Sequence, residues 1–183
     1  MIRLFVALVI PEEIKNQIIE IRNNILHAPN KFNWEDISKL HLTLKYIGEV
    51  KEDLLESILS KLNFLEDFHK INCTADRFGF FFKSKDEPRI LWLGLTIDSS
   101  IYFIVDELNR KLSYYSIPIE KRKFEAHFTL LRIKDIVAKD FIEKFTNAEF
   151  SKINFVSNEI VLMRSDLSLK GSTYTEIKKY YLK

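Results

Sequence analysis

Hydrophobic and polar positions recur along the chain with two periods, and each period predicts a type of element. Arg3 to Val9 is rich in Leu, Val and Phe and stops before Pro11, which predicts a buried strand. Pro11 suits the first turn of a helix, and isoleucines then recur at helical spacing, which predicts a helix to about Leu26. Leu40 to Ile47 alternates between two faces, which predicts a strand that ends at Gly48.

Both periods continue to the end of the chain. Apolar residues at helical spacing predict further helices at residues 53–62, 101–115 and 137–145. Apolar runs between polar turns predict strands at residues 71–75, 79–82, 89–97, 126–133, 150–156, 159–163 and 174–180, with a turn at 84–88. In the strand at 126–133, alternation places His127 and Thr129 on one face and Arg132 on the other.

This order of elements predicts an α+β fold with antiparallel sheets flanked by helices. The second half of the chain repeats the order of the first, and no linker rich in Gly or Ser separates the halves. We therefore expect a single bilobal domain over residues 1–183, in which two related lobes pack as one unit.

Composition narrows the class of protein. The 183 residues are 46% hydrophobic and 30% charged, which is typical of a globular chain with a real core. The net charge of +2 neither demands nor excludes a nucleic-acid partner. Cys73 is the one cysteine, so no intrachain disulfide forms and the cytoplasm is the simplest location. The apolar run from Leu4 to Ile10 is too short to span a membrane.

The most informative motif is a tetrapeptide that occurs twice. His41-Leu42-Thr43-Leu44 and His127-Phe128-Thr129-Leu130 both read His-x-Thr-Leu, and they lie about half the chain apart. From average composition, one such match is expected about once in 10⁴ positions. The motif falls on a predicted strand each time, so His and Thr share a face in both copies.

Two such strands side by side would bring two imidazoles and two hydroxyls into one cleft. One neutral imidazole can accept a proton while one protonated imidazole donates a proton. Threonine hydroxyls can hold the anionic oxygens of a phosphate. These groups are what cleavage of a phosphodiester without a metal requires, and from the motif alone the two histidines are interchangeable as acid and base.

Other uses of these histidines are weaker. His27 and His69 have no polar partner at strand spacing, and we interpret them as structural. Neither motif has Cys, Asp or Glu at the spacing of zinc ligands, so we expect no metal site and no cofactor. The four glycines do not form a phosphate-binding or dinucleotide-binding loop.

Several neighbours of the motifs are candidate substrate contacts. Lys45 shares the predicted face of His41 and Thr43 and is expected to attract phosphate, although solvated lysines are more common. Arg132 is a candidate contact whose role depends on local twist, with pairing to a carboxylate as the alternative. Tyr46, together with Phe5 and Trp92, is a candidate for stacking on a base. The basic run 121–123 either tracks an RNA backbone or is a solvated loop.

These residues resemble the two-histidine phosphoesterase superfamily, and within it the RNA 2′,3′-cyclic phosphodiesterases, also called 2′-5′ RNA ligases. The similarity covers nearly the whole chain. Its segments are Arg3 to Leu8, Trp34, Leu40 to Val50, Gly79 to Phe81, Pro88 to Gly94, His127 to Arg132, and Arg164 to Leu167 with Gly171 and Tyr174.

The resemblance implies a bilobal α+β fold with a pseudo-twofold axis through an active-site cleft. His41 would be the proton donor to the departing 3′ oxygen, His127 the proton acceptor from water, and Thr43 and Thr129 the phosphate ligands. The substrate would be an RNA or oligonucleotide with a 2′,3′-cyclic phosphate end, opened to a 2′-phosphate by a monomeric enzyme with no membrane association. Alternatives are 2′-5′ RNA ligation as the main role, another cyclic nucleotide as substrate, or a non-catalytic nucleotide-binding module.

Overall fold

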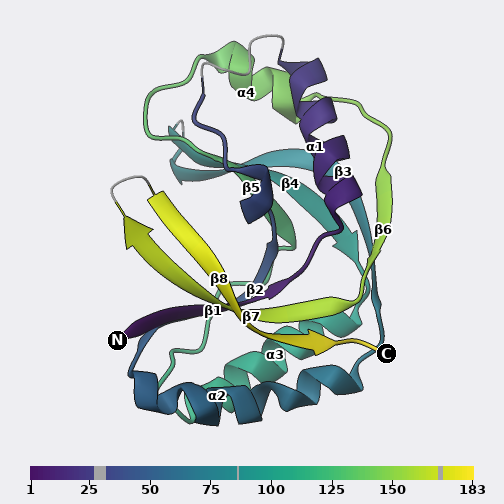
Figure 1. Ribbon diagram of the computed structural model, residues 1–183. Coiled ribbons are helices and arrows are strands. Elements are labelled where there is room, and N and C mark those ends of the chain that lie inside the picture. The colour runs from purple at the N-terminus through teal and green to yellow at the C-terminus, as the bar shows by residue number, and fades with distance from the viewer. Residues whose placement is uncertain (27–31, 86, 169–170) are drawn as a thin grey trace.

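A computed structural model describes residues 1–26, 32–85, 87–168 and 171–183 of the chain, so His27 and part of the expected turn at 84–88 lie outside the described residues. Its strands form two four-stranded antiparallel sheets (Figure 1). The first sheet has the order β2-β1-β7-β8 and the second has the order β5-β4-β3-β6. The first comprises β1 (Ile2–Leu8), β2 (Leu42–Val50), β7 (Glu159–Ser168) and β8 (Gly171–Tyr181). The second comprises β3 (Ile71–Ser84), β4 (Glu87–Ile97), β5 (His127–Arg132) and β6 (Ile153–Ser157).

The two sheets place the repeated motif in equivalent positions. Each motif strand, β2 or β5, lies at the edge of its sheet and pairs with the strand that precedes it in the chain, β1 or β4. A helix connects the two strands in both cases, as the α+β class with related lobes predicts. The two edge strands also contact each other, which brings the motifs together across the boundary between the sheets.

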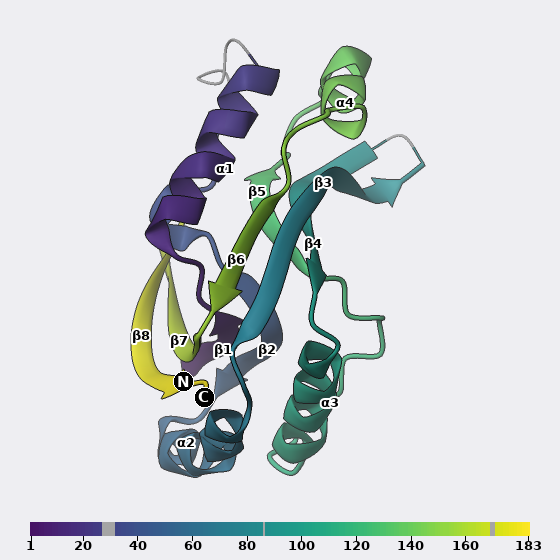
Figure 2. The same ribbon diagram turned by 90° about the vertical axis from the view of Figure 1, so that its right-hand side faces the viewer.

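The helices cover both ends of the molecule. Figure 2 shows α1 (Glu12–Ile25) and α4 (Lys139–Thr146) at one end, and α2 (Leu55–Leu62) and α3 (Ser100–Ser113) at the other. Short 3₁₀ turns lie at Ile37–Lys39, Glu52–Leu54 and Asn63–Asp67. Helix α3 connects β4 to β5 but contacts β2 of the other sheet, and α1 contacts β6. Each lobe therefore uses a helix of the other to cover its sheet.

The predicted helices exist because their apolar stripes are buried. Ile14 and Ile18 of α1 and Ile101, Ile104 and Leu108 of α3 are all at most 5% exposed. Burial of such a side chain contributes about 1.5–3 kcal/mol, so one face of each helix fixes it to the sheets. Among the described residues, no helix is long and apolar enough to cross a membrane.

Three strand predictions were wrong at their boundaries. Gly48 does not end β2, because its φ of +85° lets the backbone continue, and the strand runs on to Val50. The strands expected at 71–75 and 79–82 are one strand, β3, with a break in register between Ala75 and Arg77. Strands β7 and β8 extend beyond the predicted limits to Ser168 and from Gly171, and they form a projecting hairpin (Figure 1).

Candidate active site

Both motif histidines are held by the same backbone contact. His41 Nδ1 lies 2.6 Å from the carbonyl oxygen of Lys39, and His127 Nδ1 lies 2.7 Å from that of Glu125. A carbonyl oxygen only accepts hydrogen bonds, so Nδ1 carries the proton in each ring. Nε2 is therefore the nitrogen that gains and loses a proton in both histidines.

The two threonines follow their histidines by one strand period. Thr43 Oγ1 lies 2.9 Å from His41 Nε2 and donates a hydrogen bond to it when the imidazole is neutral. Thr129 lines the same cavity as His127. The structure thus brings all four motif residues to one cavity, as the repeat predicted.

A β-bulge in each motif changes the faces that strict alternation assigned. Val6 pairs with Lys45 and Ala7 with Thr43, so Leu44 is an extra residue in β2. Leu130 is likewise extra in β5, between the residues paired with Leu91 and Trp92. After each bulge the parity inverts, so the residues that follow exchange faces.

The inverted parity moves three candidate contacts. Tyr46 and Arg132 line the cavity with the histidines, although alternation had placed both on the opposite faces. Lys45 turns away from the cavity and is 4% exposed, so the expectation that it faces phosphate was wrong. Its counterpart in the second motif, Leu131, is buried in the same way.

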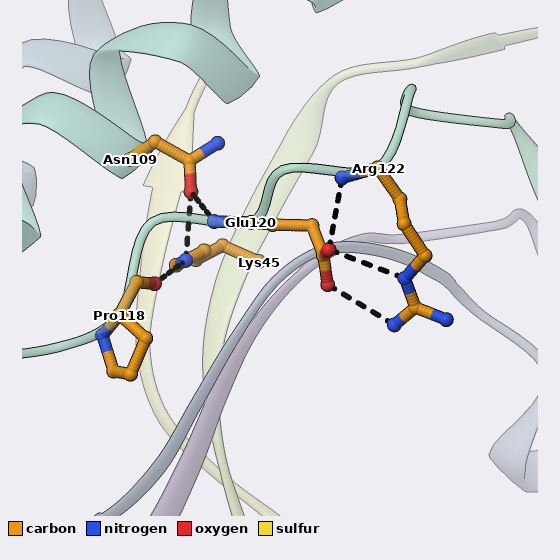
Figure 3. Close-up of polar contacts among 5 residues, drawn as sticks. All are labelled: Lys45, Asn109, Pro118, Glu120 and Arg122. Atoms are coloured by element: carbon orange, nitrogen blue, oxygen red, sulfur yellow. Dashed lines mark hydrogen bonds and ion pairs between the residues drawn. The ribbon is translucent and has the colours of Figure 1, made fainter.

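Lys45 instead anchors the loop that leads to the second motif (Figure 3). Its ammonium donates hydrogen bonds to Asn109 Oδ1 at 2.7 Å and to the carbonyl oxygen of Pro118 at 2.6 Å. Asn109 Oδ1 also accepts from the backbone N–H of Glu120 at 3.0 Å. Burial lowers the pKa of Lys45, while the charge of Glu120 opposes that shift. The strand of His41 is thereby tied to the segment preceding His127.

The same network holds back part of the basic run at 121–123. The Glu120 carboxylate accepts hydrogen bonds from the backbone N–H, Nε and Nη2 of Arg122, which lower the pKa of Glu120 to about 2. All three basic residues are exposed. Arg122 is therefore neutralised by its neighbour, whereas its side chain remains at the surface.

The cavity has a volume of about 390 Å³, large enough for a nucleotide-sized ligand. Its walls come from both sheets and from the connection between α1 and β2. Residues that the motifs did not single out for the site also line it, namely Arg3, Glu35, Lys39, Ser165, Leu167, Ser172 and Tyr174. The alternation of Ser165 with Leu167, and of Ser172 with Tyr174, was the available signal for a hairpin wall.

Aromatic rings back each histidine. The Phe5 ring lies 4.9 Å and the Tyr174 ring 5.4 Å from the His41 ring, between centroids. Phe81 lies 4.9 Å and Trp92 6.3 Å from His127. Trp92 does not line the cavity, so it supports a histidine rather than offering a surface for a base. Phe5 lines the cavity but is only 4% exposed.

Charge and burial set the protonation of the site. Burial lowers the pKa of both His41 and His127, and the nearby Arg132 guanidinium acts in the same direction. Arg132 Nε donates to Glu35 Oε1 at 2.9 Å, so both alternatives for Arg132, facing the site and pairing with a carboxylate, hold together. An anion beside the histidines would reverse the shift, because it stabilises the imidazolium.

The described residues contain no group of three or more His, Cys, Asp or Glu side chains placed to hold a metal ion. The arrangement itself offers two imidazole Nε2 atoms, two hydroxyls and a guanidinium around one cavity. Such groups can move protons to and from oxygen and stabilise negative charge on a tetrahedral or pentacoordinate centre.

Comparison with known proteins identifies similar chains. Residues 8–92 match the family model described as LigT like Phosphoesterase. Two relatives carry the name RNA 2′,3′-cyclic phosphodiesterase. The protein of Methanocaldococcus jannaschii is 31% identical over 182 residues, covering 97% of this chain and 99% of the relative. That of Thermotoga maritima is 29% identical over 173 residues, covering 94% of this chain and 91% of the relative.

A solved structure shares the fold. E. coli LigT complexed with 3′-AMP superposes with a TM-score of 0.78, at 23% identity, over 99% of this chain and 98% of that chain. The match extends across both sheets, so the bilobal arrangement described above is that of a known structural class.

Proposed function

Because the chain belongs to the family of LigT-like phosphoesterases, whose named relatives are RNA 2′,3′-cyclic phosphodiesterases, we propose that it hydrolyses a terminal 2′,3′-cyclic phosphate of RNA to a 2′-phosphate. One observation carries the proposal. The two histidines line one cavity, and each Nδ1 is engaged by a backbone carbonyl, so that each Nε2 serves as the proton-exchanging atom.

The proposed reaction is a displacement at phosphorus. His127 Nε2 accepts a proton from water as the water oxygen bonds to phosphorus. The bond from phosphorus to the 3′ oxygen breaks, and protonated His41 Nε2 donates its proton to that oxygen. The product carries a 2′-phosphate and a 3′-hydroxyl, and proton exchange with solvent returns both imidazoles to their starting states.

The remaining cavity residues stabilise charge in this scheme. Thr43 and Thr129 donate hydrogen bonds to the non-bridging phosphate oxygens, and the Arg132 guanidinium faces the same anion. Tyr46 is 58% exposed on the cavity wall and offers its ring to the terminal base. An anionic substrate raises the pKa of His41, which keeps the acid protonated when it is needed.

We also propose that residues 1–183 act as one domain and as a monomer. Both motifs and the cavity come from one copy of the chain, and α1 and α3 each contact the sheet of the other lobe. The cytoplasm is the proposed location. Cys73 is buried and its thiol pKa is raised to about 12, so it has little reactivity and suits a reducing compartment.

The test is hydrolysis of an oligoribonucleotide with a 2′,3′-cyclic phosphate end by three single variants. His41→Ala and His127→Ala should each lower kcat by about 10²–10⁴-fold, the value of general acid or base catalysis. His69→Ala is the matched control, since His69 is exposed and lies outside the cavity. Near-normal kcat in either motif variant would contradict the mechanism, and loss of activity in all three would point to a folding effect.

A further inference from the structure

A second hollow continues from the active-site cavity along the face of the first sheet. Its volume is about 240 Å³, and it shares Arg3, Ser165 and Leu167 with the active-site cavity. Its other lining residues are Met1, Ile2, Glu49 and Asp166. Because the two hollows share a wall, a ligand longer than one nucleotide can pass from one to the other.

Arg3 lies at the junction. It is two residues from Phe5 on β1, which places the two side chains on the same face about 7 Å apart along the strand. Phe5 packs on His41, so Arg3 lies one step beyond the catalytic group. That step is of the order of one sugar–phosphate repeat, so the guanidinium is positioned for the next phosphate.

The guanidinium of Arg3 has hydrogen-bonding capacity to spare. One of its five N–H groups, on Nη2, donates to Glu49 Oε1 at 2.6 Å. Its Nε is buried and has no partner among the described residues. The Glu49 side chain is 57% exposed, so it can rotate into water and yield Arg3 to a stronger anion at small cost.

Resting on the function proposed above, we propose that Arg3 binds the phosphodiester on the 5′ side of the terminal nucleotide. The site then favours a dinucleotide or longer RNA over a mononucleotide 2′,3′-cyclic phosphate. Ser165, which is buried and lines both hollows, offers a hydroxyl to the same phosphate. Leu167 of the β7–β8 hairpin is 63% exposed and lies beside the penultimate nucleoside.

The experiment compares a mononucleotide, uridine 2′,3′-cyclic phosphate, with a dinucleotide that has the same cyclic end. In the unmodified protein, kcat/KM should be higher for the dinucleotide. Arg3→Met keeps the apolar stem and removes the guanidinium. It should lower the ratio of kcat/KM for dinucleotide over mononucleotide by about 10- to 100-fold, mainly through KM, the usual effect of losing a hydrogen-bonded charge.

Glu49→Gln is the matched control. It breaks the same Arg3–Glu49 ion pair but leaves the guanidinium in place, so the ratio should stay the same or rise. A ratio unchanged by Arg3→Met, or a fall of equal size in Glu49→Gln, would overturn the proposal, since the pair would then be structural.

Binding separates this inference from the proposed function. Equilibrium titration with the dinucleotide 2′-phosphate and with uridine 2′-phosphate requires no turnover. Tighter binding of the dinucleotide that Arg3→Met abolishes supports the subsite even if neither cyclic phosphate is hydrolysed, an outcome that would refute only the proposed function. Equal affinity for the two ligands, or no binding of either, would overturn the subsite.

Discussion

Lys45 gives the sharpest separation between a structural and a substrate-binding role, because the sequence pattern and the structure assign it differently. The perturbation is Lys45→Met, which keeps an unbranched side chain of similar length and removes the buried ammonium. Two hydrogen bonds are lost, one to Asn109 Oδ1 and one to the carbonyl oxygen of Pro118.

The magnitude follows from what each acceptor retains. Asn109 Oδ1 still accepts from the backbone N–H of Glu120, but the Pro118 carbonyl loses the donor contributed by Lys45. A buried acceptor left without a partner costs about 1–3 kcal/mol, and release of the buried ammonium from its desolvation offsets part of the two lost bonds. A net loss of about 2 kcal/mol in the free energy of unfolding would lower Tm by about 4–8 °C for a chain of this size.

The assay measures Tm together with kcat and KM for a cyclic phosphate substrate. We expect Tm to fall and kcat to fall with it, because the segment before His127 loses its anchor; a misplacement of 1 Å costs up to about 10²-fold. Lys51→Met, at an exposed lysine just beyond β2, is the control and should leave Tm within about 1–2 °C. A raised KM with unchanged Tm and kcat would refute this reasoning and return Lys45 to the substrate site.

Three further predictions concern the histidines and their support. An activated nitrophenyl phosphodiester needs no protonation of its leaving oxygen, so it should partly rescue His41→Ala but not His127→Ala; the opposite pattern would reverse the assigned roles. Burial lowers the pKa of both histidines in the free protein, so the imidazolium needed as acid is lost as pH rises, and the optimum of kcat/KM should lie below about 6.5, with the basic limb of kcat at higher pH; an optimum of kcat/KM above pH 7 would contradict this. Gly79→Ala should destabilise the fold by about 1–3 kcal/mol in a denaturant titration, because its Cβ would lie 2.3 Å from the Trp92 ring that packs against His127; unchanged stability would contradict that packing.

Local patterns were sufficient to predict the elements and the centre of the site. The isoleucine spacing predicted α1, and similar spacing predicted α3, because a buried helix stripe leaves a period in the sequence whatever it packs against. The repeated tetrapeptide predicted that His41, Thr43, His127 and Thr129 share a cavity, because identical short strands on related lobes adopt equivalent positions.

The features that were missed depend on the partner strand or on distant chain segments. The bulges at Leu44 and Leu130 arise from register with β1 and β4, and a one-residue shift exchanges the faces of Lys45, Tyr46 and Arg132. The Glu35–Arg132 pair joins segments far apart in sequence. Such pairings leave no period in a single chain, so alternation alone misassigned the residues after each bulge.

The most direct test of the central claim identifies the product formed from an oligoribonucleotide with a 2′,3′-cyclic phosphate end, with the pure protein in EDTA. The account predicts complete conversion to the 2′-phosphate isomer with a free 3′-hydroxyl, at a rate that chelation does not change. A 3′-phosphate product, or activity that disappears in EDTA and returns with a divalent cation, would contradict the two-histidine mechanism.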